Sequence, residues 1–324
     1  MSPARRSWKR HAPAPATFAS VPDAVAPGVV QIDSRLGGWA EVTAAYLVEG
    51  HAPVLIDPGS RSSVPVVLAA LSDLGMTPDD LAGIAVTHVH LDHAGAVGDL
   101  ARAFPAAAVY VHPEGARHLA DPARLLASAG RVHGPLLDSL YGGLEPTPPA
   151  RIRPLADGEA IDVGGGRSLT AVHAPGHAKH HMALLDSATG TLFAGDAAGV
   201  RLPSVGVAWP ATPPPDFDLD LALASLARFA DLAPSGVALA HFGMAPGVGI
   251  LDEAAAALLA WSQVAGRALR DGVDVAEALG AAFEGAVAGA GEQARRHLDA
   301  LNGVASNAAG LRRWFERGRG PTRP

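Results

Sequence analysis

The stretch VTHVHLDHAG, residues 86–95, decides how this sequence is interpreted. It follows an apolar run and places His88, His90, Asp92 and His93 within six positions. In an extended segment, residues i and i+2 point to the same side, so His88 and His90 can hold one metal ion. A turn after them redirects Asp92 and His93 toward a second ion nearby. The pattern therefore predicts a site for two metal ions at the end of a strand.

The composition limits the chemistry of this site. The chain of 324 residues contains no cysteine, so disulfides, iron–sulfur clusters and thiol nucleophiles are excluded, and any metal ligands must be His, Asp or Glu. A formal net charge of −7 provides no general attraction to nucleic acid or to an anionic membrane. We therefore expect a small-molecule substrate, no nucleic-acid or membrane partner, and a cytoplasmic location. A homo-oligomer stays open.

Apolar patterning predicts strands and helices in alternation, which is typical of a layered α/β fold. The predicted strands are 29–36, 43–49, 53–59, 83–88 and 107–112, and the predicted helices are 64–74 and 94–104. From residue 151 the pattern becomes β-rich, and SATG at 187–190 is a plausible hairpin turn. A helix over 219–231 and a strand over 236–243 follow.

Three regions are expected along the chain. Residues 1–22 are basic and rich in Ala and Pro, which predicts a flexible tail. Residues 23–250 carry the α/β pattern and form the main domain. Residues 251–324 form a C-terminal helical segment, with two or three helices expected over 252–318.

Further titratable side chains follow the predicted strands. They are Asp57, His177 in APGH, Asp196 in AGD and His241 in ALAHFG. Strand ends of an α/β sheet meet at one edge, where such folds bind ligands. A carboxylate placed between two ions, which we assign to Asp196, would hold them about 3.5–4 Å apart.

The ordered set H-x-H-x-D-H, P-G-H, G-D and a lone His after a strand resembles the metallo-β-lactamase superfamily over about residues 28–245. The resemblance implies an αββα four-layer sandwich with a C-terminal helical appendage, in the glyoxalase II-like or lactonase-like branch. It implies a first metal on His88, His90 and His177, a second on Asp92, His93 and His241, and Asp196 bridging both. It also implies that Asp57 orients a ligand histidine.

The same resemblance implies a hydrolase with two zinc ions, iron or manganese being the alternatives. A metal-bridging hydroxide would attack an acyl ester, a thioester or a lactone, with Asp92 and Asp196 as catalytic residues. Tyr141, Lys179 and His181 are candidates for contact with the substrate. Apolar residues in 113–150 and 201–218 predict a fairly apolar pocket.

Other interpretations stay open. A mononuclear iron persulfide dioxygenase would use only His88, His177 and Asp196, and the full ligand set speaks against it. A phosphodiesterase is disfavoured by the net charge, and a binding module without catalysis would not need two metal sites. Isolated histidines such as His118 and His133 are interpreted as structural or surface residues.

Overall fold

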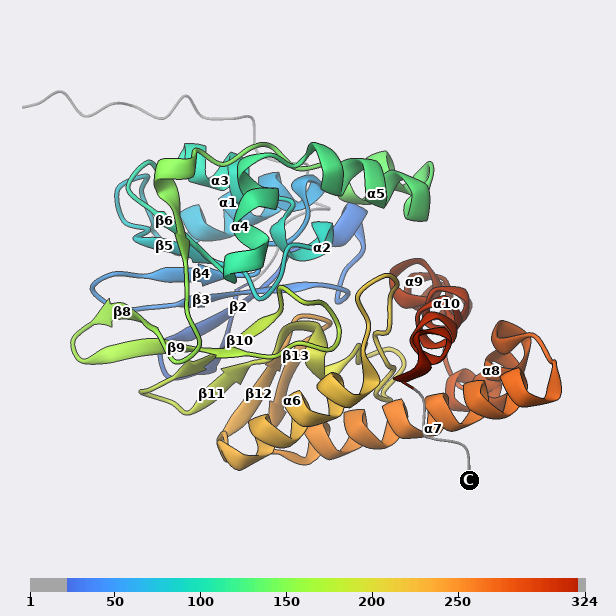
Figure 1. Cartoon of the computed structure of the whole chain (residues 1–324). Helices are drawn as coiled ribbons and strands as arrows, with labels where there is room; N and C mark the ends of the chain where they lie inside the picture. The colour runs from blue at the N-terminus through green and yellow to red at the C-terminus, as the bar shows by residue number, and fades with distance from the viewer. Residues whose placement is uncertain (1–21, 320–324) are drawn as a thin grey trace, which may run out of the picture.

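The computed structural model describes residues 22–319 (Figure 1). The flexible tail predicted for 1–22 lies, apart from its last residue, outside these described residues. Two β-sheets pack face to face, and helices cover the outer face of each sheet (Figure 1). The prediction of an αββα sandwich with C-terminal helices is therefore confirmed.

The first sheet contains seven strands in sequential order. They are β1 (Asp23–Ala26), β2 (Val29–Asp33), β3 (Ala44–Val48), β4 (Val54–Ile56), β5 (Gly83–Ala85), β6 (Ala108–Val111) and β7 (Ile152–Pro154). The strands from β1 to β4 pair antiparallel, and those from β4 to β7 pair parallel. The helices on this side are α1 (Val64–Asp73), α2 (Leu91–Ala94), α3 (Val97–Ala103), α4 (Pro113–Ala120) and α5 (Ala123–His133).

The second sheet has the order β13-β12-β11-β10-β9-β8. Its strands are β8 (Ala160–Gly164), β9 (Arg167–His173), β10 (Met182–Asp186), β11 (Thr191–Phe193), β12 (Gly236–Leu239) and β13 (Gly243–Pro246). β11 and β12 pair parallel, whereas the other neighbours pair antiparallel. The predicted turn at 187–190 joins β10 to β11. Helices α6 (Leu219–Asp231) and α7 (Gly249–Asp271) cover the outer face.

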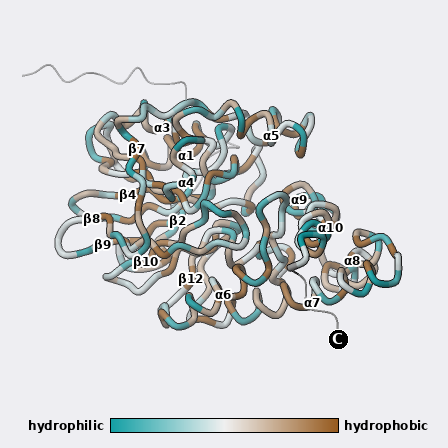
Figure 2. The backbone as a smooth tube through the Cα atoms, viewed as in Figure 1, coloured by the Kyte–Doolittle hydropathy of each residue, from teal (hydrophilic) through white to brown (hydrophobic). Residues whose placement is uncertain are grey.

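Apolar packing holds these layers together. Between the sheets, the rings of Tyr46 and Phe193 lie 5.4 Å apart, and the Tyr46 hydroxyl donates a hydrogen bond of 2.7 Å to the carbonyl oxygen of Leu239. This bond links the two sheets and satisfies the only polar atom of a buried ring. Brown and teal alternate along α6 and α7 in Figure 2, as expected of helices with one buried face.

The described part of the C-terminal segment contains four α-helices, so the expectation of two or three is wrong. They are α7, α8 (Val275–Phe283), α9 (Glu292–Asn302) and α10 (Val304–Trp314). A single residue separates the last two of them: Gly303 lies between α9 and α10, with φ −62° and ψ 163°. One extended residue breaks a helix without interrupting the surrounding apolar periodicity, so the sequence pattern does not show it.

Two predicted elements end earlier than expected. The strand over 236–243 stops at Leu239, because the chain reverses there and Gly243 pairs with Leu239 in an antiparallel hairpin. The helix predicted over 94–104 corresponds to α3, which runs from Val97 to Ala103, whereas Ala94 is the last residue of the separate α2. Within the described residues, no helix has both the length and the apolarity that crossing a lipid bilayer requires.

Candidate metal centre

The titratable groups singled out in the sequence meet at one edge of the two sheets. Each follows a strand: Asp57 follows β4, His88 follows β5, His177 follows β9, Asp196 follows β11 and His241 follows β12. α2 begins at Leu91 and carries Asp92 and His93 on its single turn. The parallel pairs β4–β5 and β11–β12 bring the carboxyl ends of neighbouring strands together, which is where such sheets place ligands.

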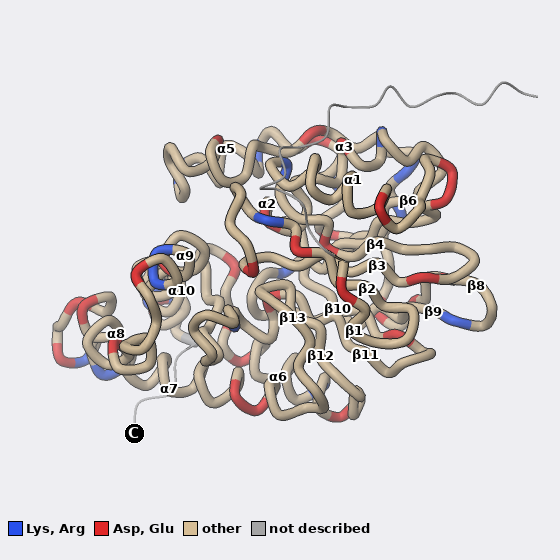
Figure 3. The backbone as a smooth tube through the Cα atoms, turned by 180° about the vertical axis from the view of Figure 1, so that it is seen from behind, with Lys and Arg blue, Asp and Glu red and all other residues tan. Residues whose placement is uncertain are grey.

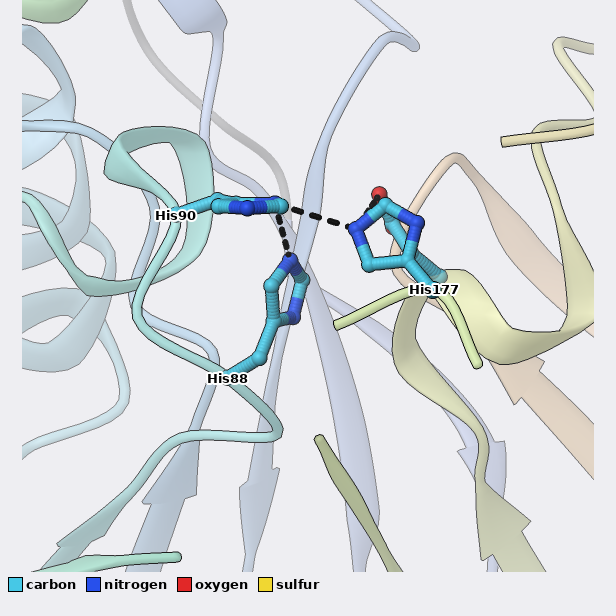
Figure 4. A group of neighbouring side chains, drawn as sticks. His88, His90 and His177 are labelled. Atoms are coloured by element: carbon cyan, nitrogen blue, oxygen red, sulfur yellow. Dashed lines mark hydrogen bonds and ion pairs between the residues drawn. The ribbon is translucent and has the colours of Figure 1, made fainter. Parts of the chain in front are cut away.

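Three imidazole rings form the first group of potential ligands. Nδ1 of His90 lies 2.9 Å from Nε2 of His88 and 3.0 Å from Nε2 of His177 (Figure 4). His88 and His90 come from one loop, and His177 reaches them from the second sheet (Figure 4). With a carboxylate oxygen of Asp196, their ligand atoms all lie within 4.8 Å of one another.

Asp92, His93 and His241 form the second group, again within 4.8 Å. Asp196 contacts both groups through different oxygens. Its Oδ2 lies 3.5 Å from Nε2 of His177. Its Oδ1 lies 3.3 Å from Nε2 of His93 and 3.3 Å from Nε2 of His241. This is the geometry that a carboxylate bridging two ions requires.

The donor set fits divalent cations. Nitrogen atoms that carry lone pairs point at one another in the first group, an arrangement that a shared cation stabilises. In the second group, the buried His93 Nε2 and Asp196 Oδ1 have no hydrogen-bond partner. Leaving buried polar atoms unpaired costs free energy, whereas coordination to a cation satisfies them. Imidazole and carboxylate ligands together suit zinc, iron and manganese.

The outward-facing ring nitrogens are held by hydrogen bonds. Nδ1 of His177 donates to the carbonyl oxygen of Ala211 at 3.0 Å, and Nδ1 of His241 donates to that of Val42 at 2.9 Å. Each bond places a proton on Nδ1 and turns Nε2 toward the centre, where it can coordinate a metal ion once it carries no proton.

Asp57 contacts Nδ1 of His93, as the two carbonyl oxygens contact Nδ1 of His177 and His241. Its Oδ2 lies 3.2 Å from Nδ1 of His93 and also accepts a hydrogen bond of 2.8 Å from the Thr87 hydroxyl. Its Oδ1 accepts a bond of 2.7 Å from the Thr87 amide. The carboxylate is thus 4 % exposed and fully engaged, and it holds the His93 ring in one orientation.

Burial and charge affect the two groups in opposite directions. Burial lowers the pKa of His88, His90 and His177, so these rings are neutral at neutral pH. Burial alone would also lower the pKa of His241, but Asp196 and Asp92 outweigh it and raise this pKa to about 10. Asp196 and Asp92 likewise raise the pKa of His93.

Glycines let the chain come close enough to form the centre. Gly176, which precedes His177, has φ +141°, and a Cβ there would lie 2.4 Å from the backbone of Ala222 in α6. Gly195, which precedes Asp196, has φ +52°, and a Cβ there would lie 2.5 Å from the Thr87 hydroxyl. Both glycines of the P-G-H and G-D motifs are therefore required by close packing.

A cleft of ≈ 520 Å³ opens above the centre. One wall is formed by α4 and α5, and the opposite wall by residues 213–216 and by the ends of α9 and α10. Tyr141 and Lys179, two of the predicted substrate contacts, line it. His181 does not: it is fully buried, and its ring stacks behind that of His88 at 5.0 Å.

The cleft also contains residues that the sequence did not single out. His118, His133 and His180 line it, as do Arg117, Arg124 and Arg131. The expectation of a fairly apolar pocket is therefore wrong on this wall, where the helices turn their polar faces inward. The available signal was the seven-residue spacing of Arg124 and Arg131, which places these two on the same face of one helix, α5.

Comparison with known proteins agrees with this geometry. A family model described as the metallo-beta-lactamase superfamily matches residues 38–242. The metallo-beta-lactamase fold-containing protein ST1585 from Sulfurisphaera tokodaii is 34% identical over 211 residues, which are 64% of this chain and 75% of that protein. Its crystal structure superimposes with a TM-score of 0.66 and 28% identity, covering 88% of this chain and 98% of the other.

Two relatives have names that state an activity. An atrochrysone carboxyl ACP thioesterase from Aspergillus fumigatus is 29% identical over 156 residues, 48% of this chain and 29% of that protein. A hydroxyacylglutathione hydrolase from Xanthomonas campestris is 30% identical over 175 residues, 53% of this chain and 51% of that protein. The match thus covers less than a third of the thioesterase and about half of the hydroxyacylglutathione hydrolase.

Proposed function

The chain belongs to the metallo-β-lactamase superfamily, and we propose that it is a dinuclear metal-dependent hydrolase of a small acyl compound. The observation that carries this proposal is the division of seven ligand side chains into two groups that share Asp196. A single ion would need only one group. Zinc is the proposed metal, because imidazole nitrogen and carboxylate oxygen are among its preferred ligands; the metal count below distinguishes it from iron.

Two bound ions would supply Lewis-acid polarisation of the acyl carbonyl and a water molecule of lowered pKa. The protein's own side chains position the ions and the substrate. Asp196 faces both groups, and Asp92 faces the second group, with its Oδ2 3.5 Å from Nε2 of His241. Tyr141 lines the cleft, and burial raises the pKa of its phenol, which therefore stays protonated and donates a hydrogen bond to the substrate carbonyl.

Among acyl ester, lactone and thioester substrates, we favour the thioester. Two relatives, one a thioesterase and one a hydrolase of hydroxyacylglutathione, support this choice. The cleft volume lies within the range of pockets that bind small molecules.

The test combines metal counting with hydrolysis. Protein purified without added metal should contain about two zinc ions per chain by plasma mass spectrometry, and it should hydrolyse a panel of thioesters. Asp92→Ala should lower kcat by about a hundredfold or more while the circular dichroism spectrum is retained. The exposed Asp79→Ala serves as a control of equal charge change and should match the wild type.

Two outcomes would contradict the proposal. Unchanged turnover in Asp92→Ala would show that the second group does not take part. One iron per chain, with oxygen consumption on a persulfide and no thioester hydrolysis, would replace the hydrolase by a dioxygenase.

A further inference from the structure

Three arginines form one wall of the cleft above the metal centre. Arg117 lies on α4, and Arg124 and Arg131 lie on α5; all three are exposed and line the cleft. We call these three residues the arginine wall. In Figure 1, α5 projects from the upper helical layer on the same side of the molecule as α9 and α10.

The arginine wall has no charge partner within the protein. Over residues 22–319, no carboxylate oxygen lies within 4.0 Å of these three guanidinium groups, and Arg117 donates a hydrogen bond of 3.3 Å to His118. Some arginines of the C-terminal helices are paired: Arg295 contacts Glu284 at 2.6 Å, and Arg312 contacts Asp274 at 3.2 Å. Figure 3 shows acidic and basic positions side by side in that region.

The charge of the cleft differs in sign from that of the chain. The chain carries a formal net charge of −7. Outside the metal-binding residues, however, the acidic lining residues are Glu114 and Asp216, and Asp216 is engaged with Lys179 at 3.4 Å. The arginine wall is thus an uncompensated cluster of positive charge beside the metal centre. Such a cluster in a concave site attracts anions and raises their local concentration.

We propose that the arginine wall binds a phosphorylated arm of the substrate while the acyl group lies at the metal centre. The proposal rests on the hydrolase function proposed above. Arginine is suited to this role, because its planar guanidinium presents paired donors to phosphate oxygens. One carboxylate is satisfied by a single bidentate arginine, whereas three arginines match the several charges of a phosphate or diphosphate.

The first test compares substrates that share one thioester bond. Acetyl-coenzyme A carries a phosphorylated arm, S-acetyl-N-acetylcysteamine carries a neutral arm, and S-acetylglutathione carries a carboxylate arm. The wild type should prefer acetyl-coenzyme A, as measured by kcat/KM. Replacing the three residues by Gln (Arg117→Gln, Arg124→Gln, Arg131→Gln) should lower the preference for acetyl-coenzyme A over the neutral substrate about tenfold, mainly through KM.

A matched control changes the same charge elsewhere. Arg267, Arg270 and Arg313 are exposed, lie outside the cleft lining, and belong to α7 and α10. Their triple replacement by Gln should leave the preference for acetyl-coenzyme A within twofold of the wild type. An equal loss in both triple variants would show a general effect of net charge and would overturn the proposal.

The second test does not depend on hydrolysis. Desulfo-coenzyme A has the phosphorylated arm but no thiol, so its binding to metal-free protein can be followed by calorimetry. Its Kd should rise about tenfold in the arginine-wall variant, and it should rise with salt in the wild type because exposed charges are screened over about 10 Å at 0.1 M.

The two tests distinguish a failure of the phosphate-binding proposal from a failure of the hydrolase proposal. Salt-dependent binding of desulfo-coenzyme A that needs the arginine wall, without turnover of any thioester, would refute the hydrolase and retain the anion site. Hydrolysis with no preference among the three arms would refute the anion site alone. If the wild type prefers S-acetylglutathione and the arginine-wall variant loses this preference, the arginine wall binds a carboxylate arm. That result would also overturn the phosphate proposal.

Discussion

At the scale of single residues, the two halves of the metal centre differ in the protons they hold. His88, His90 and His177 have lowered pKa values because they are buried, so their nitrogen lone pairs are free at neutral pH. His93 and His241 have raised pKa values because Asp196 lies between them. In the metal-free protein, protons on these two rings neutralise the carboxylates that the second ion would otherwise neutralise.

This difference predicts proton release on metal loading. The first group should bind an ion with little proton release, whereas the second should release protons from His93 and His241. Because the pKa of His241 is raised to about 10, the affinity of the second group should increase from pH 7 toward pH 10 and level off above it. Zinc titration by calorimetry in buffers of different ionisation enthalpy measures the release.

The folding stability of the metal-free protein should depend on the same two histidines, His93 and His241. Unlike the metal affinity, it should fall as the pH rises. A histidine whose folded pKa is raised stabilises the fold fully below its unfolded value of about 6.5 and loses this contribution as pH rises through about 10. For zinc binding, a titration that shows two identical steps without proton release, at constant affinity from pH 7 to pH 10, would contradict the predicted proton release.

Asp57 is the clearest case of a residue that acts through another. As a carboxylate it accepts hydrogen bonds from the Thr87 amide, the Thr87 hydroxyl and His93 Nδ1. An amide has one accepting oxygen and cannot accept all three. Asp57→Asn should therefore weaken zinc binding at the second group by about 10–100-fold. The first group should keep its affinity, which competition with a chelator can show, and an equal loss at both groups would instead indicate general unfolding.

At the scale of elements, the start of α6 determines where His177 lies. The amide of Asp218, the residue before α6, donates a hydrogen bond of 2.9 Å to the carbonyl oxygen of Gly176, and the backbone of Ala222 is within 2.4 Å of where a Cβ on Gly176 would be. The Ser225 hydroxyl donates to the carbonyl oxygen of Pro175 at 2.7 Å. The helix and the P-G-H loop are thus packed as one unit.

Gly176→Ala should disturb this unit. The added methyl group must displace either α6 or the loop that carries His177, which should cost about 1–3 kcal/mol of stability and reduce the metal content. Differential scanning calorimetry and metal analysis measure the two effects. Gly75→Ala is the control, since Gly75 also has a positive φ of +81° but nothing within 4 Å of the added Cβ. Equal losses in the two variants would show that backbone strain alone, without the clash, explains the effect.

At the scale of the whole molecule, the C-terminal helices support the metal centre from a distance. Asn307 on α10 is fully buried, and its Oδ1 accepts bonds from the Thr212 amide at 2.8 Å and from the Thr212 hydroxyl at 2.7 Å. The neighbouring Ala211 carbonyl accepts the bond from His177 Nδ1. The orientation of a ligand histidine therefore depends on a helix more than a hundred residues further along the chain.

Asn307→Ala should break this connection. The buried Thr212 amide loses its acceptor, whereas the Thr212 hydroxyl keeps the Asn307 carbonyl oxygen at 3.1 Å. The loss should cost about 1–3 kcal/mol of stability, and zinc affinity at the first group should fall. Denaturant unfolding and zinc titration test both effects. Ser306→Ala, a change at the neighbouring position of α10, should have a small effect on stability. A destabilised Asn307→Ala protein with unchanged zinc affinity would show that the helix stabilises the fold without positioning His177.

Much of the fold and of the centre was accessible from the sequence because its signals are local in the chain. The ligand spacing within residues 88–93 is set by the geometry of a few consecutive peptide units. The same holds for the glycines that precede His177 and Asp196. Alternating apolar segments likewise predicted the layered α/β architecture and the helix over 219–231, which the structure places at Leu219–Asp231.

Only the tertiary structure decided which side chains share the cleft. His181 lies behind His88, whereas Arg117 and Arg124 face the cleft, although nothing in their sequence neighbourhoods distinguishes a covered helix face from an open one. That choice depends on contacts with distant segments such as the end of α9 at Asn302, which completes the opposite wall. Local patterns determine the chemistry that a segment can perform, and long-range packing determines what it faces.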